Sequence, residues 1–124
     1  MDTDSVLDSV KKLSLIDPND TSFDQQICVY INSVFSTLYQ IGALTSFAPI
    51  MDNKPVWGSY ISDPILLGFV ISYVGAKVKL KFDPPAGSSA MDALVQIIAE
   101  DEWRINAYVD YKPTSDGEED NNGV

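Results

Sequence analysis

The sequence predicts an all-α protein: a small helical bundle of four to five helices, with a short irregular loop or β-hairpin insertion and a disordered acidic C-terminal tail. Apolar residues recur at helical spacing in four stretches of the chain. Proline or glycine residues separate these stretches, which is typical of helix boundaries. With 124 residues, of which 45% are hydrophobic, the chain is long enough to bury one core. We therefore expect one helical domain over residues 1–110 and a flexible acidic tail over residues 111–124.

A short first helix is expected near the N-terminus. Its apolar residues share one helical face: Val6, Leu7, Val10 and Leu13. Asp4 is the expected N-cap of this helix. Residues 17–20, which include Pro18, then form a turn.

The second helix has the clearest pattern and is expected over residues 21–41. Thr21 and Asp24 match a variant capping box at its start, and Gly42 ends it in the C′ position. Its apolar stripe consists of Phe23, Ile27, Tyr30, Ile31, Val34, Leu38 and Ile41. Cys28, Phe35 and Tyr39 widen this stripe, so we expect the helix to pack against two neighbours.

Residues 43–58 break the helical period. Two apolar segments, each marked by a proline, flank the polar residues 52–54. This pattern is compatible with a loop or with a small irregular β-hairpin. A short helical turn is expected to follow near residues 59–61.

The third helix is expected to be the most buried. Asp63 and Pro64 form an N-cap with proline in the first helical position. From Ile65 to Phe82 the sequence is apolar on almost every side. Residues 76–82 also alternate as a strand would, but continuity with the preceding residues favours helix.

One narrow stripe of the third helix departs from this apolar pattern: Gly68, Ser72 and Gly75, with Lys79 beyond. Glycine inside a helix costs about 1 kcal/mol relative to alanine, so a packing reason is expected. The favoured interpretation is close packing against another helix of the same subunit. The alternative is close approach by a neighbouring subunit.

The last helix follows a break at Pro84-Pro85, and Ser88 or Ser89 is expected to cap it. The predicted inner face comprises Met91, Leu94, Val95, Ile98, Ile105 and Val109. Glu102 stands in the middle of this face, whereas Trp103 points to the polar side. A buried carboxylate needs a partner, and Lys77 or Lys81 is the candidate for a buried charge pair with Glu102.

The composition argues against catalysis and against binding to nucleic acid. The sequence contains no histidine and a single cysteine, Cys28, so it lacks the commonest general base and any cysteine cluster. We expect no enzymatic activity, no cofactor and no metal. The net charge of −10 includes −4 from residues 110–124, and so acidic a surface repels phosphate backbones. The sequence shows no signal peptide and no segment that would span a bilayer, which favours a cytoplasm-like compartment.

Two groups of side chains are candidate contact surfaces. Lys77, Lys79 and Lys81 form the only basic cluster, and charge complementing a helix C-terminus is favoured over contact with an acidic partner or passing DNA. Large aromatic side chains could form an interface patch: Phe47, Trp57, Tyr60 and Trp103.

Three segments occur in a distinctive order: TSFDQQICVYINSVFSTLYQIG at residues 21–42, KLKFDPP at 79–85 and AEDEWRIN at 99–106. This order resembles that of phage head–tail connector (adaptor) proteins, the gp6-like neck family of long-tailed bacteriophages. The resemblance covers roughly residues 5–109. FDPP at 82–85 and EWR at 102–104 are its most specific signatures.

The resemblance implies a structural virion protein that assembles in the host cytoplasm into a homo-oligomeric ring, dodecameric in this family. The ring sits beneath the portal protein in the neck, bridges to the next neck or tail-completion protein, and lets DNA pass through its lumen. Portal contact would fall on residues from Trp103 through the tail, and residues 43–58 would face the lumen or tail. The candidate partner-binding residues are Trp103, Arg104, Tyr108, Tyr111, Phe47, Trp57, Gly68, Ser72, Gly75 and Lys79.

The alternative function is a small acidic phage-encoded inhibitor that mimics DNA and occupies a basic groove of a host enzyme. Such a mimic needs carboxylates along one surface at phosphate-like spacing. Here the acids are scattered, and the densest run lies in the tail, which favours the connector.

Overall fold

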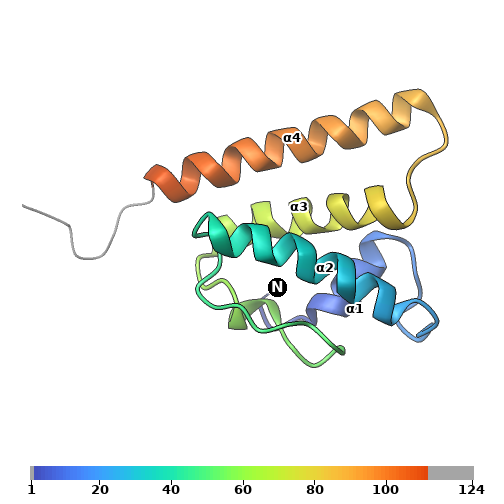
Figure 1. The fold of residues 1–124 in the computed structure, drawn as a ribbon, viewed down its shortest axis with the longest axis horizontal. Coiled ribbons are helices and arrows are strands. Elements are labelled where there is room, and N and C mark those ends of the chain that lie inside the picture. The colour runs from blue at the N-terminus through green and yellow to red at the C-terminus, as the bar shows by residue number, and fades with distance from the viewer. Residues whose placement is uncertain (1, 112–124) are drawn as a thin grey trace, which may run out of the picture.

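The computed structural model describes residues 2–111, and this part of the chain is an all-α bundle without strands. It contains α1 (Val6–Leu13), α2 (Asp24–Gln40), α3 (Pro64–Phe82) and α4 (Ser88–Tyr111), with a short 3-10 helix, η1 (Trp57–Ser59), before α3. Figure 1 shows that α3 lies between α4 on one side and α1 with α2 on the other. The predicted fold class is confirmed. Of the tail expected over residues 111–124, Tyr111 is the last residue of α4, and the rest lies outside the described residues.

The start of α1 differs from the prediction by one residue. Ser5, not Asp4, is the N-cap, and its hydroxyl accepts a hydrogen bond from the backbone N–H of Asp8 at 3.2 Å. Ser5 also forms an isolated antiparallel bridge with Val56, which ties the N-terminal segment to the insertion. Ser5 therefore caps α1 with its side chain and pairs with the insertion through its backbone.

The start of α2 was also predicted incorrectly. The helix begins at Asp24, and its N-cap, Phe23, provides no side-chain hydrogen bond, so Thr21 and Asp24 form no capping box. Asp24 instead forms an ion pair with Lys11, with 2.8 Å between the carboxylate oxygen and the ammonium nitrogen. The buried Lys11 ammonium also donates a hydrogen bond to the carbonyl of Pro18 at 2.9 Å. A buried ammonium needs such partners. The Asp24 carboxylate therefore pairs with Lys11 and takes no part in a capping box. At the other end Gly42 has φ +86°, as expected of a C′ residue.

The insertion over residues 43–58 is an irregular loop and not a hairpin. Asn32 of α2 holds it at Ile50: the Asn32 amide donates to the carbonyl of Ile50 at 2.9 Å and accepts from its N–H at 2.7 Å. Thr45 N–H donates to the carbonyl of Tyr60 at 3.0 Å. These bonds satisfy backbone groups that a strand partner would otherwise satisfy. The expected helical turn near 59–61 occurs at η1, two residues earlier.

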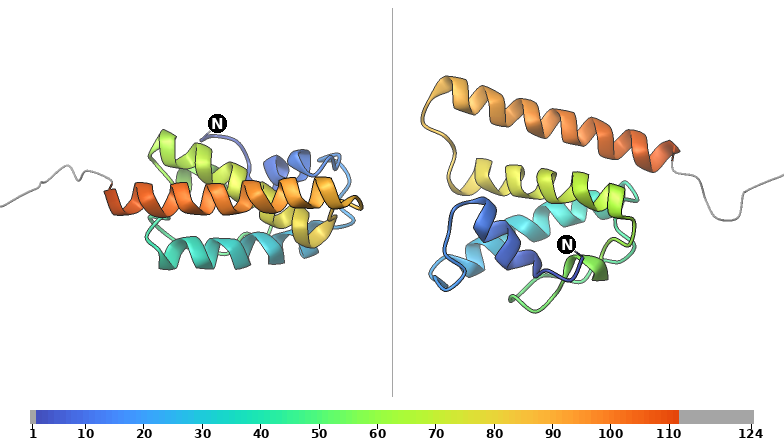
Figure 2. Two further views of the ribbon diagram at one scale, coloured as in Figure 1. Left: turned by 90° about the horizontal axis from the view of Figure 1, so that it is seen from above. Right: turned by 180° about the vertical axis from the view of Figure 1, so that it is seen from behind.

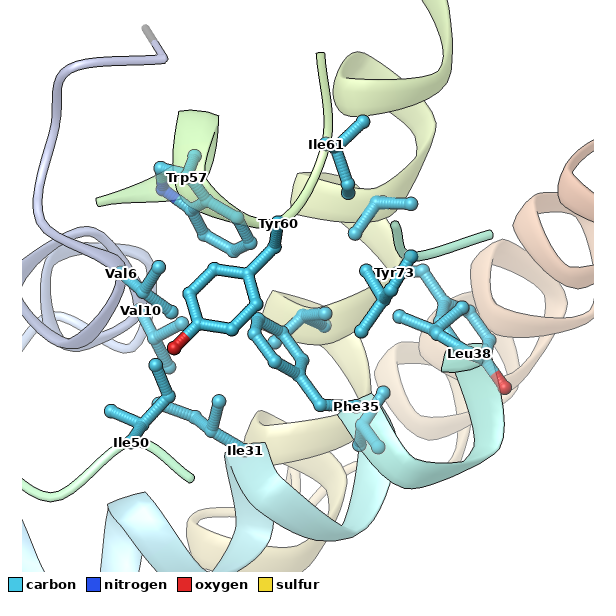
Figure 3. Packing of buried hydrophobic residues seen from close by; sticks show 14 of the residues in the cluster. Val6, Val10, Ile31, Phe35, Leu38, Ile50, Trp57, Tyr60, Ile61 and Tyr73 are labelled. Carbon is cyan, nitrogen blue, oxygen red and sulfur yellow. The ribbon is translucent and has the colours of Figure 1, made fainter. Parts of the chain in front are cut away.

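The core lies between α1, α2, α3 and the end of the insertion (Figure 3). Trp57 is 0% exposed and its indole N–H donates to the hydroxyl of Ser9 at 3.1 Å. The ring of Phe35 packs against those of Trp57 and Tyr60, at centroid distances of 6.1 and 5.0 Å. Trp57 and Tyr60 are therefore core residues, which corrects their prediction as an interface patch. The flanking prolines and polar residues break the apolar period, so the sequence does not predict that these two residues are buried.

The prediction for α3 is confirmed, including its helical C-terminal half. The Asp63 carboxylate accepts from the N–H groups of Ile65 and Leu66, and Pro64 occupies the first turn. α3 contacts α1, α2 and α4, which explains why it is apolar on most sides. None of the described helices is long and apolar enough to cross a membrane.

α4 forms an outer layer that packs mainly on α3 (Figures 1 and 2). It begins at Ser88, so Ser88 and Ser89 lie inside its first turn and do not cap it from outside. Of its 24 residues only Leu94, Asp101 and Ile105 are buried. A helix with so narrow a buried stripe leaves most of its circumference available to other molecules.

Candidate functional site

The contact between α3 and α4 depends on hydroxyl groups that donate to carboxylates. Ser72 donates to Asp101 at 2.5 Å, and Tyr73 donates to Glu102 at 2.8 Å. Burial, together with the bond to Glu102, raises the pKa of Tyr73. These bonds fix the rotation of α4 about its axis, because they join neighbouring positions on each helix.

A third bond of this kind lies at the other end of the contact. Tyr108 of α4 donates to Asp63, the N-cap of α3, at 2.6 Å. The hydrogen bond to Asp63 raises the pKa of Tyr108, and burial adds to the shift. The ring of Tyr108 also packs edge-on against Phe69, with 6.2 Å between centroids. The C-terminal end of α4 is thus held in register with the start of α3.

The predicted buried charge pair is not what the structure contains. Glu102 is exposed and bonds to Tyr73, and no ion pair of Glu102 with Lys77 or Lys81 occurs in residues 2–111. Lys77 instead lies over the ring of Tyr73, 5.8 Å from its centroid.

The buried carboxylate is the preceding residue, Asp101. Consecutive helix residues point about 100° apart, so an error of one position changed the assignment. The spacing of Asp101 from Leu94 (i−7) and Ile105 (i+4) could have revealed it.

The predicted stripe on α3 lines one groove of roughly 370 Å³, here named the α3 groove. Its floor comprises Gly68, Ser72, Gly75 and Lys79. Leu13 of α1 and Ile71 of α3 border it on one side and Ile97 of α4 on another. The sequence pattern places Leu13 on the buried face of the first helix and assigns no role to Ile97. Both side chains are exposed. The groove is therefore an apolar surface to which three helices contribute.

The two glycines of this groove have different surroundings. A Cβ at Gly75 would lie 2.7 Å from Cδ1 of Leu13, so packing of α1 within the same chain accounts for this glycine. A Cβ at Gly68 would have no neighbour within 4 Å. Intrachain packing therefore explains Gly75 and does not explain Gly68, which carries the cost of about 1 kcal/mol without a contact inside the chain.

The C-terminal residues predicted as a partner site do lie together. Trp103, Arg104, Tyr108 and Tyr111 line a shallow depression of roughly 300 Å³ with Phe69 of α3. We name this surface the aromatic end of α4. Trp103 is 69% exposed and Tyr111 is 84% exposed, although both are large aromatic side chains. Exposed tryptophan, tyrosine and arginine in one place are characteristic of protein–protein contact centres.

Phe47 does not belong to this surface. It lies in the insertion and packs against Tyr39 of α2, with 6.1 Å between ring centroids. With Trp57 buried, the predicted aromatic patch divides into this pair and the separate aromatic end of α4.

The chemistry of the described residues points to binding. No group of three or more histidine, cysteine, aspartate or glutamate side chains that could hold a metal ion occurs within residues 2–111. The exposed features are an apolar groove and an aromatic surface with one arginine. Exposed apolar surfaces of this kind are typical of proteins that act by contact with other proteins.

A comparison with family models identifies the family to which the chain belongs. The model described as phage connector protein matches residues 6–112. The chain belongs to the phage connector protein family, and its role is that of a structural component of the virion. Comparisons with curated proteins and with solved structures gave no match.

Proposed function

We propose that this connector is an adaptor of the gp6-like neck family, which assembles as a dodecameric ring beneath the portal protein. The ring completes the DNA-filled head and bridges it to the next neck or tail-completion protein. Membership of the phage connector protein family supports this proposal. Assembly would take place in the host cytoplasm, and the ring would remain in the neck of the virion.

The observation that carries the proposal is the aromatic end of α4. Trp103, Arg104 and Tyr111 are exposed around one depression, at the end of the helix from which the chain continues into its acidic segment. Such side chains supply most of the binding energy in protein interfaces. We assign the portal contact to this surface.

The acidic composition is compatible with a conduit for DNA. The net charge is −10, and a wall of this sign repels phosphate groups, so DNA slides past without adhering. The insertion over residues 43–58 is the candidate for the lumen or tail-side surface.

The experiment is to mix the purified protein with its purified portal and to examine the mixture by sedimentation and electron microscopy. The wild-type protein should be monomeric or weakly associated alone and should form a ring on the portal. Trp103→Ala with Arg104→Ala should weaken portal binding by roughly tenfold or more. Leu15→Ala, at another exposed apolar residue outside the aromatic end of α4 and outside the insertion, is the control.

A wild-type protein that stays monomeric in the presence of its portal would overturn the proposal. Capture of a host nuclease from lysate, with no binding to portal, would support the alternative function of a DNA mimic.

A further inference from the structure

The exposed face of α2 carries no charged residue, which is unusual in a chain with 21% charged residues. We name this face the α2 stripe; it consists of Gln25, Val29, Ser33, Ser36 and Gln40, all of which are exposed. Val29 is 64% exposed although it is apolar. Depletion of charge is a feature of the centres of protein interfaces. The stripe therefore has the composition of a contact surface, and the fold leaves it without a partner.

The α3 groove is the second surface of this kind. Between Gly68 and Gly75 its floor is uncharged, and Leu13 and Ile97 add exposed apolar side chains at its sides. Gly68 leaves room for a backbone to approach, and nothing within the chain uses that room. A helix with small side chains, such as Ser33 and Ser36, is the type of element that fits a groove with a glycine floor.

The helices α2, which carries the stripe, and α1, which borders the groove, lie on opposite long sides of the molecule. The left view of Figure 2 shows α2 along one side, and α1 with the first half of α3 along the other. Two different surfaces on opposite sides give a head-to-tail contact, which repeats from copy to copy and closes into a ring when the rotation permits.

We propose that the α2 stripe of one copy packs into the α3 groove of the next copy, and that this contact joins the subunits of the ring. The inference rests on the proposed function, which it deepens by naming the surfaces between neighbouring subunits. Each copy contributes one stripe and one groove, so no subunit in a closed ring has an unused surface.

Charge at one end of the two surfaces supports a second copy as the occupant. Phe23 at the start of α2 packs against Phe82 at the end of α3, with 5.2 Å between ring centroids, so these helix ends lie together. A copy related by rotation about the long axis would therefore bring Asp17 and Asp20, both exposed before α2, level with the end of the neighbour's groove at Lys79, which within its own chain lies 3.9 Å from the exposed carboxylate of Asp83. Opposite charges then meet at the rim while the uncharged parts meet at the centre.

Cross-linking tests this contact even where association is weak. The single native thiol, Cys28, is buried, and burial raises its pKa, so an introduced cysteine reacts first with a maleimide. Ser33→Cys and Gly68→Cys are prepared separately and treated with a short bismaleimide, alone and as an equimolar mixture with portal present. The mixture should give cross-linked dimers in roughly tenfold excess over either variant alone.

A second pair of variants tests the contact without cross-linking. Gly68→Leu fills the groove at a position with no intrachain neighbour and replaces a poor helix former with a good one, so the monomer should have an equal or higher melting temperature while ring formation weakens by roughly tenfold or more. Gly87→Leu adds the same side chain at another glycine with open surroundings, outside both surfaces, and should assemble normally.

The outcomes distinguish this inference from the proposed function. Dimers from one variant alone would indicate a symmetric contact and overturn the inference, as would normal rings from Gly68→Leu. If wild-type rings form on the portal but the mixture gives no cross-link, the function stands and the assigned surfaces are wrong. If the wild-type protein forms no ring on the portal, the proposed function fails.

Discussion

At the scale of single residues, the end of α1 contains the one described non-glycine residue with a left-handed backbone. Leu15 has φ +62°. The N–H groups of Leu15 and Ile16 donate to the carbonyls of Lys12 and Lys11, which is the Schellman arrangement at a helix C-terminus. Leu15 occupies the position where glycine is preferred, and its side chain is 91% exposed. The chain therefore accepts backbone strain here without gaining buried surface.

Leu15→Gly should stabilise the protein. It removes the clash between Cβ and backbone, which outweighs the greater flexibility of glycine in the unfolded chain, and the expected gain is about 0.5–1 kcal/mol. Urea unfolding followed by circular dichroism measures it. Leu15→Ala is the control, because it removes the exposed side chain but keeps the strained Cβ, and it should change stability little. An equal gain in both variants would show that strain is not the cause.

Residue roles that depend on distant parts of the chain were beyond sequence patterns. The sequence shows Lys11 as a lysine next to Lys12, yet Lys11 is buried and pairs with Asp24. The local sequence pattern predicts that Asp24 belongs to a capping box. In the folded protein Asp24 instead forms a tertiary ion pair with Lys11. The same holds for Trp57, whose partner Ser9 lies 48 positions away.

At the scale of helices, the four main elements follow from local patterns because periodicity and the proline and glycine boundaries act over short distances. The rotation of α4 does not. Val95 and Glu102 were placed on its buried face, but both are exposed, and Asp101 is buried instead. Hydrogen bonds to Ser72 and Tyr73 set the rotation, and a polar contact of this kind leaves no apolar period in the sequence.

The α3–α4 contact should make stability fall at alkaline pH. Tyr73 has a raised pKa in the folded protein because of burial and Glu102. Above pH of about 10 the unfolded chain releases this proton while the folded protein retains it, so stability present below that pH is lost as pH rises. Urea unfolding at a series of alkaline pH values measures the slope. Tyr73→Phe should be less stable near neutral pH by about 0.5–1.5 kcal/mol and should show a shallower decline. An unchanged slope would contradict this assignment.

At the scale of the whole molecule, the sequence predicted which residues share a helix face better than it predicted how those faces are arranged in space. The residues of the α3 groove were predicted as one stripe, because a single helix orders them. Leu13 and Ile97 could not be assigned to it, since only the folded chain brings α1 and α4 to its sides. The position of α2 on the side opposite to α1 is likewise a property of the assembled bundle (Figure 2).

The whole-molecule charge predicts that the protein does not bind DNA. With a net charge of −10, association with duplex DNA should be undetectable by fluorescence anisotropy at low salt, where electrostatic attraction is strongest. The protein is tested up to roughly 100 µM, within the range where non-specific binders of DNA associate. Lys77 and Lys81 are the residues that could reverse this result, because they lie near the end of α3 without an ion pair among the described residues. Binding that weakens with salt and disappears in Lys77→Gln with Lys81→Gln would contradict the prediction. It would also indicate that the end of α3 is a contact surface for DNA.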